Sequence, residues 1–271
     1  MDKLFDLSGK TAIITGGNGV LGGAMAEGLA RAGASVAVLG RTEKTVNRQV
    51  ETITQNGGTA LSLLADVLSL SDLNQAKEKV LDEWGQIDIL INAAGGNIAG
   101  AIINPDQSFL DLDDQAFEQV INLNFHGTYL PAKVFSEPMI ESQKGSIINI
   151  SSMAAQKVIS RVVGYSAAKA AIDNFTKSLA VELANKHGDG LRVNAIAPGF
   201  FIGKQNRDLL LNKDESLTSR GQTIVDHTPM DRFGEADELI GTAVWLSSEA
   251  SKFVTGTIIP VDGGFSAFSG V

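Results

Sequence analysis

Residues 10–23 read KTAIITGGNGVLGG, and this stretch decides the fold. The apolar run at 10–15 predicts a short buried strand, which the glycine-rich segment 16–19 ends. From Val20 to Gly33 the apolar residues have helical spacing, and Gly33 suits a helix C-terminus. A strand, a glycine turn and a helix in this order direct free backbone N–H groups and the positive end of the helix at a phosphate. Many tight turns look alike, but the position of this one favours phosphate binding.

The alternation of strands and helices continues along the chain. Almost continuously apolar strands are predicted at 35–39, 60–65, 87–91, 147–150, 191–197 and 256–261. Helices are predicted at 42–56, 71–84, 113–138 and 236–246, and another opens at Tyr165. Apolar strands separated by amphipathic helices indicate a parallel sheet covered on both faces. We therefore expect an α/β protein over residues 1–271: a single-domain Rossmann fold with a doubly wound, seven-stranded parallel sheet.

Polar side chains fall where four of the predicted strands end. They are Thr15, Arg41, Asp66 and Asn92. Because ligands of parallel sheets bind beyond the carboxyl ends of the strands, we expect a ligand site at this edge. Residues 97–111 are expected to form a loop. Residues 200–231 lack clear periodicity and have the length of a substrate lid, in which residues 205–211 could form a short helix.

Composition narrows the class of protein. The 271 residues carry a net charge of −9 and a pI of about 4.8, which disfavours nucleic acid and anionic membranes as partners. The absence of cysteine excludes a disulfide and a thiol nucleophile. No set of His, Asp and Glu residues has metal-ligand spacing, so we expect no catalytic metal. The first residues lack the apolar core of a signal peptide and no apolar run could span a membrane, so we expect a cytoplasmic protein.

Tyr165 and Lys169 form a second pattern. They are four residues apart and would share one face of a helix. A lysine ammonium beside a phenol favours the phenolate and lowers the tyrosine pKa from its reference value of about 10. Such a tyrosine could exchange a proton near neutral pH. Ser152 follows the strand at 147–150, and a strand–loop–helix unit could bring its hydroxyl near the phenol. Taken alone, the pair could also be an accident of an amphipathic helix.

The predicted helix at 113–138 carries unusual residues near its centre. Asn124 and Gly127 are mildly unfavourable inside a helix. They suggest a local kink or a polar task for Asn124, and a tolerated mismatch is the alternative. His126 is interpreted as structural or as a surface residue.

Together these motifs resemble those of the short-chain dehydrogenase/reductase family, in its compact single-domain form, from about Leu7 to Gly264. The matching motifs are Thr15–Gly17, Asp66–Val67, Asn92–Gly95, Asn124, Ser152, Tyr165–Lys169 (YSAAK) and Pro198–Gly199. Two positions depart from the family's pattern. Val20 stands where the family usually has a glycine, with Gly19 one place earlier, so the phosphate-facing geometry of the turn is expected to differ slightly. Gly203 stands where relatives often carry a threonine that touches the nicotinamide amide.

The resemblance implies four catalytic residues. Tyr165 would be the general acid in ketone reduction and the base in alcohol oxidation. Lys169 would lower the pKa of this tyrosine and bind the nicotinamide ribose. Ser152 would hydrogen-bond the substrate oxygen, and Asn124 would hold a water that relays protons to Lys169. In the alternative interpretation Ser152 caps a strand and Asn124 kinks a helix. The residues implied to bind the cofactor are Gly16, Asn18, Gly19, Val20, Leu21, Arg41, Asp66, Val67, Asn92, Ala93, Ala94, Gly95, Tyr165, Lys169, Pro198 and Gly199.

The end of the second strand bears on the choice of cofactor. A carboxylate there would hold the adenosine 2′-hydroxyl and repel a 2′-phosphate. This chain has Gly40-Arg41 and no acid. The positive charge of Arg41 and the space left by a glycine favour NADP over NAD. In the alternative, Arg41 would stack on the adenine of NAD.

The substrate depends on segment 200–231 and the C-terminal tail, which resemble those of D-mannonate oxidoreductases (fructuronate reductases). The resemblance implies reduction of D-fructuronate to D-mannonate. A cationic, amide-rich lid suits a carboxylate with several hydroxyls. The candidates for binding the carboxylate are Arg161, with Arg207 or Arg220. These arginines could equally form surface or subunit salt bridges.

Two other functions stay open at this point. Oxidoreduction of gluconate or deoxygluconate, or the activity of another keto reductase of the family, is the nearest, and a cofactor-binding regulator without turnover belongs to a different class. A regulator would have no use for the four implied catalytic residues, Asn124, Ser152, Tyr165 and Lys169. The family resemblance also implies a homotetramer, and the apolar tail 265–271 would suit burial against a neighbouring subunit.

Overall fold

The computed structural model describes residues 2–203 and 206–270. Its centre is a seven-stranded sheet of order β3-β2-β1-β4-β5-β6-β7, in which every neighbouring pair is parallel. The strands are β1 (Thr11–Thr15), β2 (Ser35–Gly40), β3 (Thr59–Leu64), β4 (Ile89–Asn92), β5 (Gly145–Ile150), β6 (Leu191–Pro198) and β7 (Ile258–Val261). The expected fold, a single-domain Rossmann fold with a doubly wound parallel sheet, is confirmed.

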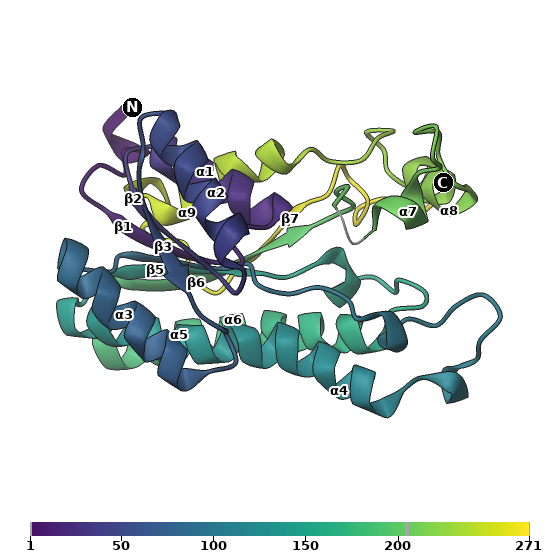
Figure 1. Ribbon diagram of the computed structural model, residues 1–271, viewed down its shortest axis with the longest axis horizontal. Helices are drawn as coiled ribbons and strands as arrows, with labels where there is room; N and C mark the ends of the chain where they lie inside the picture. Colours follow the sequence, from purple (N-terminus) through teal and green to yellow (C-terminus); the bar gives the residue numbers. More distant parts are fainter. Residues whose placement is uncertain (1, 204–205, 271) are drawn as a thin grey trace.

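Helices cover both faces of the sheet (Figure 1). One face carries α1 (Val20–Arg31), α2 (Glu43–Gln55) and α9 (Ile240–Ser247). The other carries α3 (Leu70–Trp84), α5 (Gly127–Ser142) and α6 (Val163–His187). Short 3₁₀ turns lie at Asp2–Leu4, Ala99–Ala101, Phe109–Asp111, Met153–Ala155, Ala236–Leu239 and Glu249–Ser251. Among the described helices, none is both long and apolar enough to cross a bilayer.

The strands are continuously apolar because each face of the sheet has its own core. Ile13 and Ile14 are both fully buried, yet they point to opposite sides, Ile14 toward α1 and α9 and Ile13 toward α3 and α5. Burying an aliphatic side chain of this size is worth about 1.5–3 kcal/mol. Strand β1, packed between β2 and β4 in the middle of the sheet, is therefore a fixed platform for the turn that follows it.

The helix predicted at 113–138 is interrupted in the structure. It consists of α4 (Asp114–Ile121), a π-helical turn (Asn122–His126) and α5, which continues to Ser142. The kink suggested by Asn124 thus exists. The predicted end at Pro138 is wrong, because α5 accommodates Pro138 and ends only at Gln143, whose φ of 55° is left-handed.

Segment 200–231 has more structure than its sequence indicates. It contains α7 (Arg207–Leu210) and α8 (Ser219–Asp226), which lie together at one end of the molecule in Figure 1. The predicted helix at 205–211 is shorter, and Lys204 and Gln205 lie outside the described residues. Helix α8 was not predicted. Its first turn is capped by Thr218, whose hydroxyl accepts a hydrogen bond from the Gly221 amide at 3.0 Å.

Candidate active site

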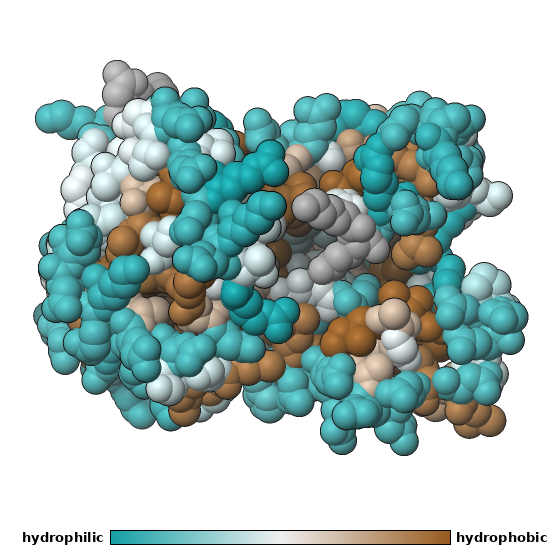
Figure 2. All heavy atoms as spheres, viewed as in Figure 1, coloured by the Kyte–Doolittle hydropathy of each residue, from teal (hydrophilic) through white to brown (hydrophobic). Residues whose placement is uncertain are grey.

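A cavity of about 590 Å³ lies beyond the carboxyl ends of the central strands. Figure 2 shows this face hollowed near its centre, with apolar side chains around the opening. The lining comes from four parts of the chain: the turn after β1, the turn after β4, the segment from β5 into α6, and the segment after β6 with Arg220 of α8. The expected ligand site at this edge of the sheet therefore exists as a cavity.

The turn after β1 and the first turn of α1 have no space for a side chain at two glycines, Gly16 and Gly22. Gly16 has a φ of 62°, and a Cβ on Gly22 would lie 2.3 Å from the Gly16 carbonyl oxygen. Helix α1 begins after Gly19 without any side-chain cap, so its first N–H groups stay available at the cavity wall. These features fit the diphosphate of a dinucleotide at the positive end of α1. Val20 lines the cavity and does not disrupt the turn.

The end of β2 leaves no room for an acidic side chain. A Cβ on Gly40 would lie 2.4 Å from Oδ1 of Asn18, whose amide donates to the Thr45 hydroxyl at 2.7 Å. Arg41 is mostly exposed, and its guanidinium lies 3.9 Å from the Asp66 carboxylate. The region that would face an adenosine ribose is thus an exposed arginine beside a glycine.

Not every predicted cofactor residue reaches the cavity. Eleven of the predicted residues line it: Gly16, Asn18, Gly19, Val20, Leu21, Ala93, Gly95, Tyr165, Lys169, Pro198 and Gly199. The other five, Arg41, Asp66, Val67, Asn92 and Ala94, are not part of its lining. Asn92 is buried, and its Nδ2 donates to Asn149 Oδ1 at 2.9 Å between β4 and β5. Its side chain therefore joins two strands.

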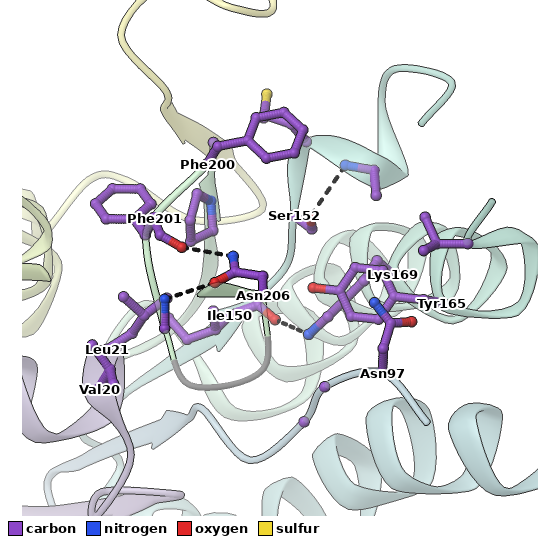
Figure 3. Close-up of a pocket in the computed structure, with 18 of the residues that line it drawn as sticks. Val20, Leu21, Asn97, Ile150, Ser152, Tyr165, Lys169, Phe200, Phe201 and Asn206 are labelled. Atoms are coloured by element: carbon purple, nitrogen blue, oxygen red, sulfur yellow. Dashed lines mark hydrogen bonds between the residues drawn. The ribbon is translucent and has the colours of Figure 1, made fainter. Parts of the chain in front are cut away.

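Ser152, Tyr165 and Lys169 converge on the cavity (Figure 3). Ser152 lies close enough to the Tyr165 phenol to lower its pKa, and its hydroxyl accepts a hydrogen bond from the Ala154 amide at 3.1 Å. Lys169 is only 4% exposed; its Nζ lies 5.5 Å from the Tyr165 ring centroid and donates to the Ile150 carbonyl at 2.6 Å. The strand–loop–helix unit β5–α6 thus brings a hydroxyl, a phenol and an ammonium together from residues 152–169.

The net shift of the Tyr165 pKa is upward, opposite to the expected direction. Burial raises the pKa of Tyr165, and Ser152 opposes that shift only in part. Burial also lowers the pKa of Lys169 to about 8, because desolvation disfavours the ammonium, while the charge of Asp173 raises it. Lys169 is held on a backbone carbonyl rather than on the phenol, which accounts for the difference.

Asp173 was not predicted as part of the site. It lies one turn after Lys169 on α6, and Oδ1 accepts a hydrogen bond from the buried Ser151 hydroxyl at the end of β5. Burial raises the pKa of Asp173 despite that bond and the charges of Lys177 and Lys169. The carboxylate thus ties α6 to the strand that carries Ser152.

Asn124 sits in the π turn with its amide fully occupied. Its Oδ1 accepts from the Gly96 amide at 3.0 Å, and its Nδ2 donates to the carbonyls of Gly96 and Val120, both at 2.8 Å. The side chain is fully buried, and a Cβ on Gly95 would lie 2.6 Å from its Oδ1. The amide therefore clamps the turn after β4 to the helix.

The three candidate arginines are placed differently. Arg161 and Arg220 line the cavity, whereas Arg207 does not and forms an ion pair with Glu215 within its own segment. Sequence reasoning also missed Asn97, which lines the cavity and points toward Tyr165 in Figure 3. The Asn97 Oδ1 is buried without a hydrogen-bond partner among the described residues. The only signal was its place directly after the Gly95-Gly96 turn that follows β4.

Within residues 2–203 and 206–270, no three His, Asp or Glu side chains are grouped so that they could hold a metal ion.

Comparison with known proteins gives consistent matches over the whole fold. The family model described as enoyl-(acyl carrier protein) reductase matches residues 18–266. The uncharacterized oxidoreductase UxuB of Bacillus subtilis (strain 168) is 50% identical over 98% of both chains. The 5-keto-D-gluconate 5-reductase of Escherichia coli (strain K12) is 33% identical over 97% of this chain and 98% of its own.

Two solved structures carry nicotinamide cofactors. A provisionally named D-mannonate oxidoreductase from Haemophilus influenza, with bound NAD, superimposes with a TM-score of 0.91 and 42% identity over 98% of both chains. A gluconate 5-dehydrogenase from Burkholderia cenocepacia J2315, in complex with NADP and tartrate, has a TM-score of 0.87 and 29% identity over 98% of both chains.

Proposed function

The chain belongs to the short-chain dehydrogenase/reductase family and is an oxidoreductase, and from that premise we propose its cofactor, substrate and catalytic residues. We propose that it transfers a hydride between NAD(P) and the carbonyl or alcohol carbon of a sugar acid. The substrate pair that we propose is D-fructuronate and D-mannonate. The observation that carries the proposal is the convergence of Ser152, Tyr165 and Lys169 on a cavity whose other wall is the glycine turn.

The residues of the cavity suggest how the proton moves. In reduction, the Tyr165 phenol gives its proton to the substrate oxygen while Ser152 donates a hydrogen bond to that oxygen as negative charge develops on it. In oxidation the same groups act in reverse, and the phenolate takes the proton of the alcohol. The nicotinamide, when bound, supplies or accepts the hydride. Lys169, in its protonated form, stabilises the phenolate that remains after reduction and is placed to meet the nicotinamide ribose.

Asn124 belongs to this site as a support. Its amide is used by Gly96 and Val120, so we propose that it acts by holding the turn after β4 beside Lys169. A water relay through Asn124 would have to use the second lone pair of Oδ1 or a backbone atom, because both Nδ2 protons and one lone pair of Oδ1 are engaged.

We propose that the protein takes NAD or NADP and prefers NADP. In support, Gly40 carries no acid that would repel a 2′-phosphate, and the exposed Arg41 beside it supplies positive charge. Related structures hold either cofactor, NAD in one and NADP with tartrate in another. The ratio of kcat/KM values for the two cofactors tests this choice, and a strong preference for NAD would overturn it.

The substrate class is supported by the relatives and by the charge of the cavity. One relative is named a 5-keto-D-gluconate 5-reductase and another a 2-dehydro-3-deoxy-D-gluconate 5-dehydrogenase, so a gluconate-type acid is the main rival to fructuronate. Arg161 and Arg220 supply positive charge at the cavity wall, as a carboxylate requires. A cofactor-binding regulator without turnover stays the alternative of a different class.

One experiment separates these possibilities. Oxidation of NADPH and of NADH is followed with a panel of keto-sugar acids on the wild-type protein and on Tyr165→Phe. We expect fructuronate to have the highest kcat/KM, and Tyr165→Phe to lose activity at least roughly 100-fold while its cofactor Kd stays within about twofold. Turnover of 5-ketogluconate alone would favour the rival. Cofactor binding with no turnover of any keto acid would favour the regulator.

We also propose that residues 200–231 form the substrate lid and that the chain assembles as a homotetramer. In support of assembly, Phe253 and Val181 are exposed apolar side chains. In the tail, Phe265 packs edge-to-face on Phe200 with ring centroids 5.2 Å apart, which ties the tail to the start of the lid in the same chain. Light scattering on the full chain, and on a chain that ends before Phe265, tests the assembly and the role of the tail.

A further inference from the structure

Two arginines without acidic partners face the same cavity. Arg161 comes from the segment between β5 and α6, and Arg220 from the first turn of α8. Both are half-buried, and within the described residues neither has a carboxylate oxygen within 4.0 Å. The chain has 31 acidic and 22 basic residues, so unpaired and partly buried arginines are not a consequence of its composition. Two half-buried guanidiniums without an acid make the cavity a favourable place for an anion.

Arg161 is held rigidly. Its φ of 77° lies in the left-handed region, which is strained for a residue with a Cβ. Its carbonyl accepts from the Ile103 amide at 2.9 Å, and its Nε donates to the Ile103 carbonyl at 2.6 Å. Nη2 donates to Asn104 Oδ1 at 3.1 Å. The loop after β4 thus forms hydrogen bonds with both the backbone and the side chain of Arg161, and these bonds stabilise the strained conformation.

Arg220 is held weakly. Its two hydrogen bonds, from Nη1 to the Ser160 hydroxyl and from Nη2 to the Ser160 carbonyl, are both 3.4 Å long. Bonds of that length are weaker than the usual 2.7–3.2 Å. Burial, and then the charge of Arg161, lower the pKa of Arg220. Since Ser160 directly precedes Arg161, these bonds place Arg220 beside the segment that carries Arg161, and the two cations repel each other.

The hydrogen bonds of Arg220 also connect α8 to the loop that precedes α6. Among the hydrogen bonds of the described residues, those from Arg220 to Ser160 are the ones that join segment 206–226 to the loop 152–162. Helix α8 packs on α7, where a Cβ on Gly221 would lie 2.2 Å from the Leu210 carbonyl oxygen. Movement of α8 would therefore carry Arg220 and part of the cavity wall together.

We propose that the carboxylate of the substrate binds between Arg161 and Arg220 and thereby fastens α8 to the body of the protein, so that closure over the cavity depends on the substrate's charge. Each guanidinium has five N–H donors. Each uses two of them in the bonds described above, which leaves three for a carboxylate. The anion removes the repulsion between the two cations and adds charge-assisted bonds to both. This inference deepens the proposed function and rests on it for the sugar-acid class.

The proposal predicts which molecules close the site. A sugar acid bridges the two arginines, whereas a sugar alcohol of the same carbon number binds without closing α8 over the cavity. The pair D-mannonate and D-mannitol differs in this way. With reduced cofactor present neither is oxidised, so closure is observed without turnover.

The test is hydrogen exchange of residues 219–226 in the wild-type protein, with reduced cofactor and with D-mannonate, D-gluconate, tartrate or D-mannitol. We expect the carboxylates to slow exchange of these amides and mannitol to leave it unchanged. The variant Arg220→Met is expected to abolish the slowing, and its kcat/KM for the keto acid is expected to fall roughly 10- to 100-fold. The matched control is Arg207→Met, because Arg207 lies on the same segment but pairs with Glu215 outside the cavity.

Two results would overturn the inference. One is that none of the carboxylates slows exchange of α8 in the wild-type protein; the other is that Arg207→Met loses the response as fully as Arg220→Met. These results differ from failure of the proposed function, which is the absence of turnover of any sugar acid by a protein whose α8 still responds to carboxylates. Arg161→Met, checked for folding by its melting temperature, is expected to behave as Arg220→Met does.

Discussion

Replacing Asn124 by alanine would remove an amide that makes three hydrogen bonds, two with Gly96 in the turn after β4 and one with the Val120 carbonyl of α4. Each of these bonds contributes about 1 kcal/mol net, and the backbone groups left unpaired cost more because the site is fully buried. We therefore expect a loss of about 3–5 kcal/mol in the free energy of unfolding. For a chain of this size that corresponds to a fall of roughly 10 °C in Tm.

Urea denaturation followed by tryptophan fluorescence, together with steady-state kinetics, measures both consequences. The matched control is Asn74→Ala, since Asn74 is exposed on α3 and makes a single bond to the Leu70 carbonyl. We expect the control to lose less than about 0.5 kcal/mol. If Asn124→Ala kept its stability and its cofactor Kd but lost kcat, the clamp would be refuted and a direct part in proton transfer would take its place.

Three further changes have defined outcomes. Gly22→Ala places a methyl group 2.3 Å from the Gly16 carbonyl oxygen, and such overpacking costs about 1–3 kcal/mol. The cofactor Kd, measured by fluorescence titration, should therefore rise roughly 10- to 100-fold. An unchanged Kd would contradict the role of the turn after β1 in binding the cofactor's diphosphate. Asp173→Asn removes the charge that raises the pKa of Lys169, now about 8, so the fall of activity as Lys169 loses its proton should move to lower pH. A pH profile that moves upward or stays in place would contradict this assignment. Gln143→Gly relieves a φ of 55° and should raise the urea midpoint, by about 0.5–1 kcal/mol in stability, with no change in kcat.

The sheet could be predicted because its signal is local. Runs such as 11–15 are apolar at every position, and both Ile13 and Ile14 are buried because the strand has a core on each side. The place of the cavity followed from the same reasoning, since every parallel strand ends at one edge, although Thr15, Arg41, Asp66 and Asn92 do not line it. The YSAAK spacing fixed the shared face of Tyr165 and Lys169, because helix geometry determines it.

Features that depend on contacts between distant segments could not be predicted in this way. Asp173 resembles any polar residue of a surface helix until Ser151, from a strand, lies against it. Helix α8 has a glycine in its first turn, and only the close Leu210 carbonyl explains that glycine. The choice between Arg207 and Arg220 required the direction of α8. The pKa of Tyr165 depends on burial, which spacing does not report.

The π turn at Asn122–His126 has a consequence for how the chain can change. In terms of register, a π turn is one residue inserted into an α-helix. Because the wide turn takes up this residue, deleting one there would restore a regular helix and keep the face of α5, whereas a deletion within α5 would rotate everything after it by about 100°, one residue's share of a 3.6-residue turn. A deletion in α5 before Phe135 would turn Phe135 and Met139, now packed on the sheet, away from it. The π turn is therefore the place in this helix where the chain can lose one residue without turning α5 on the sheet, and what such a loss would change is the position of Asn124.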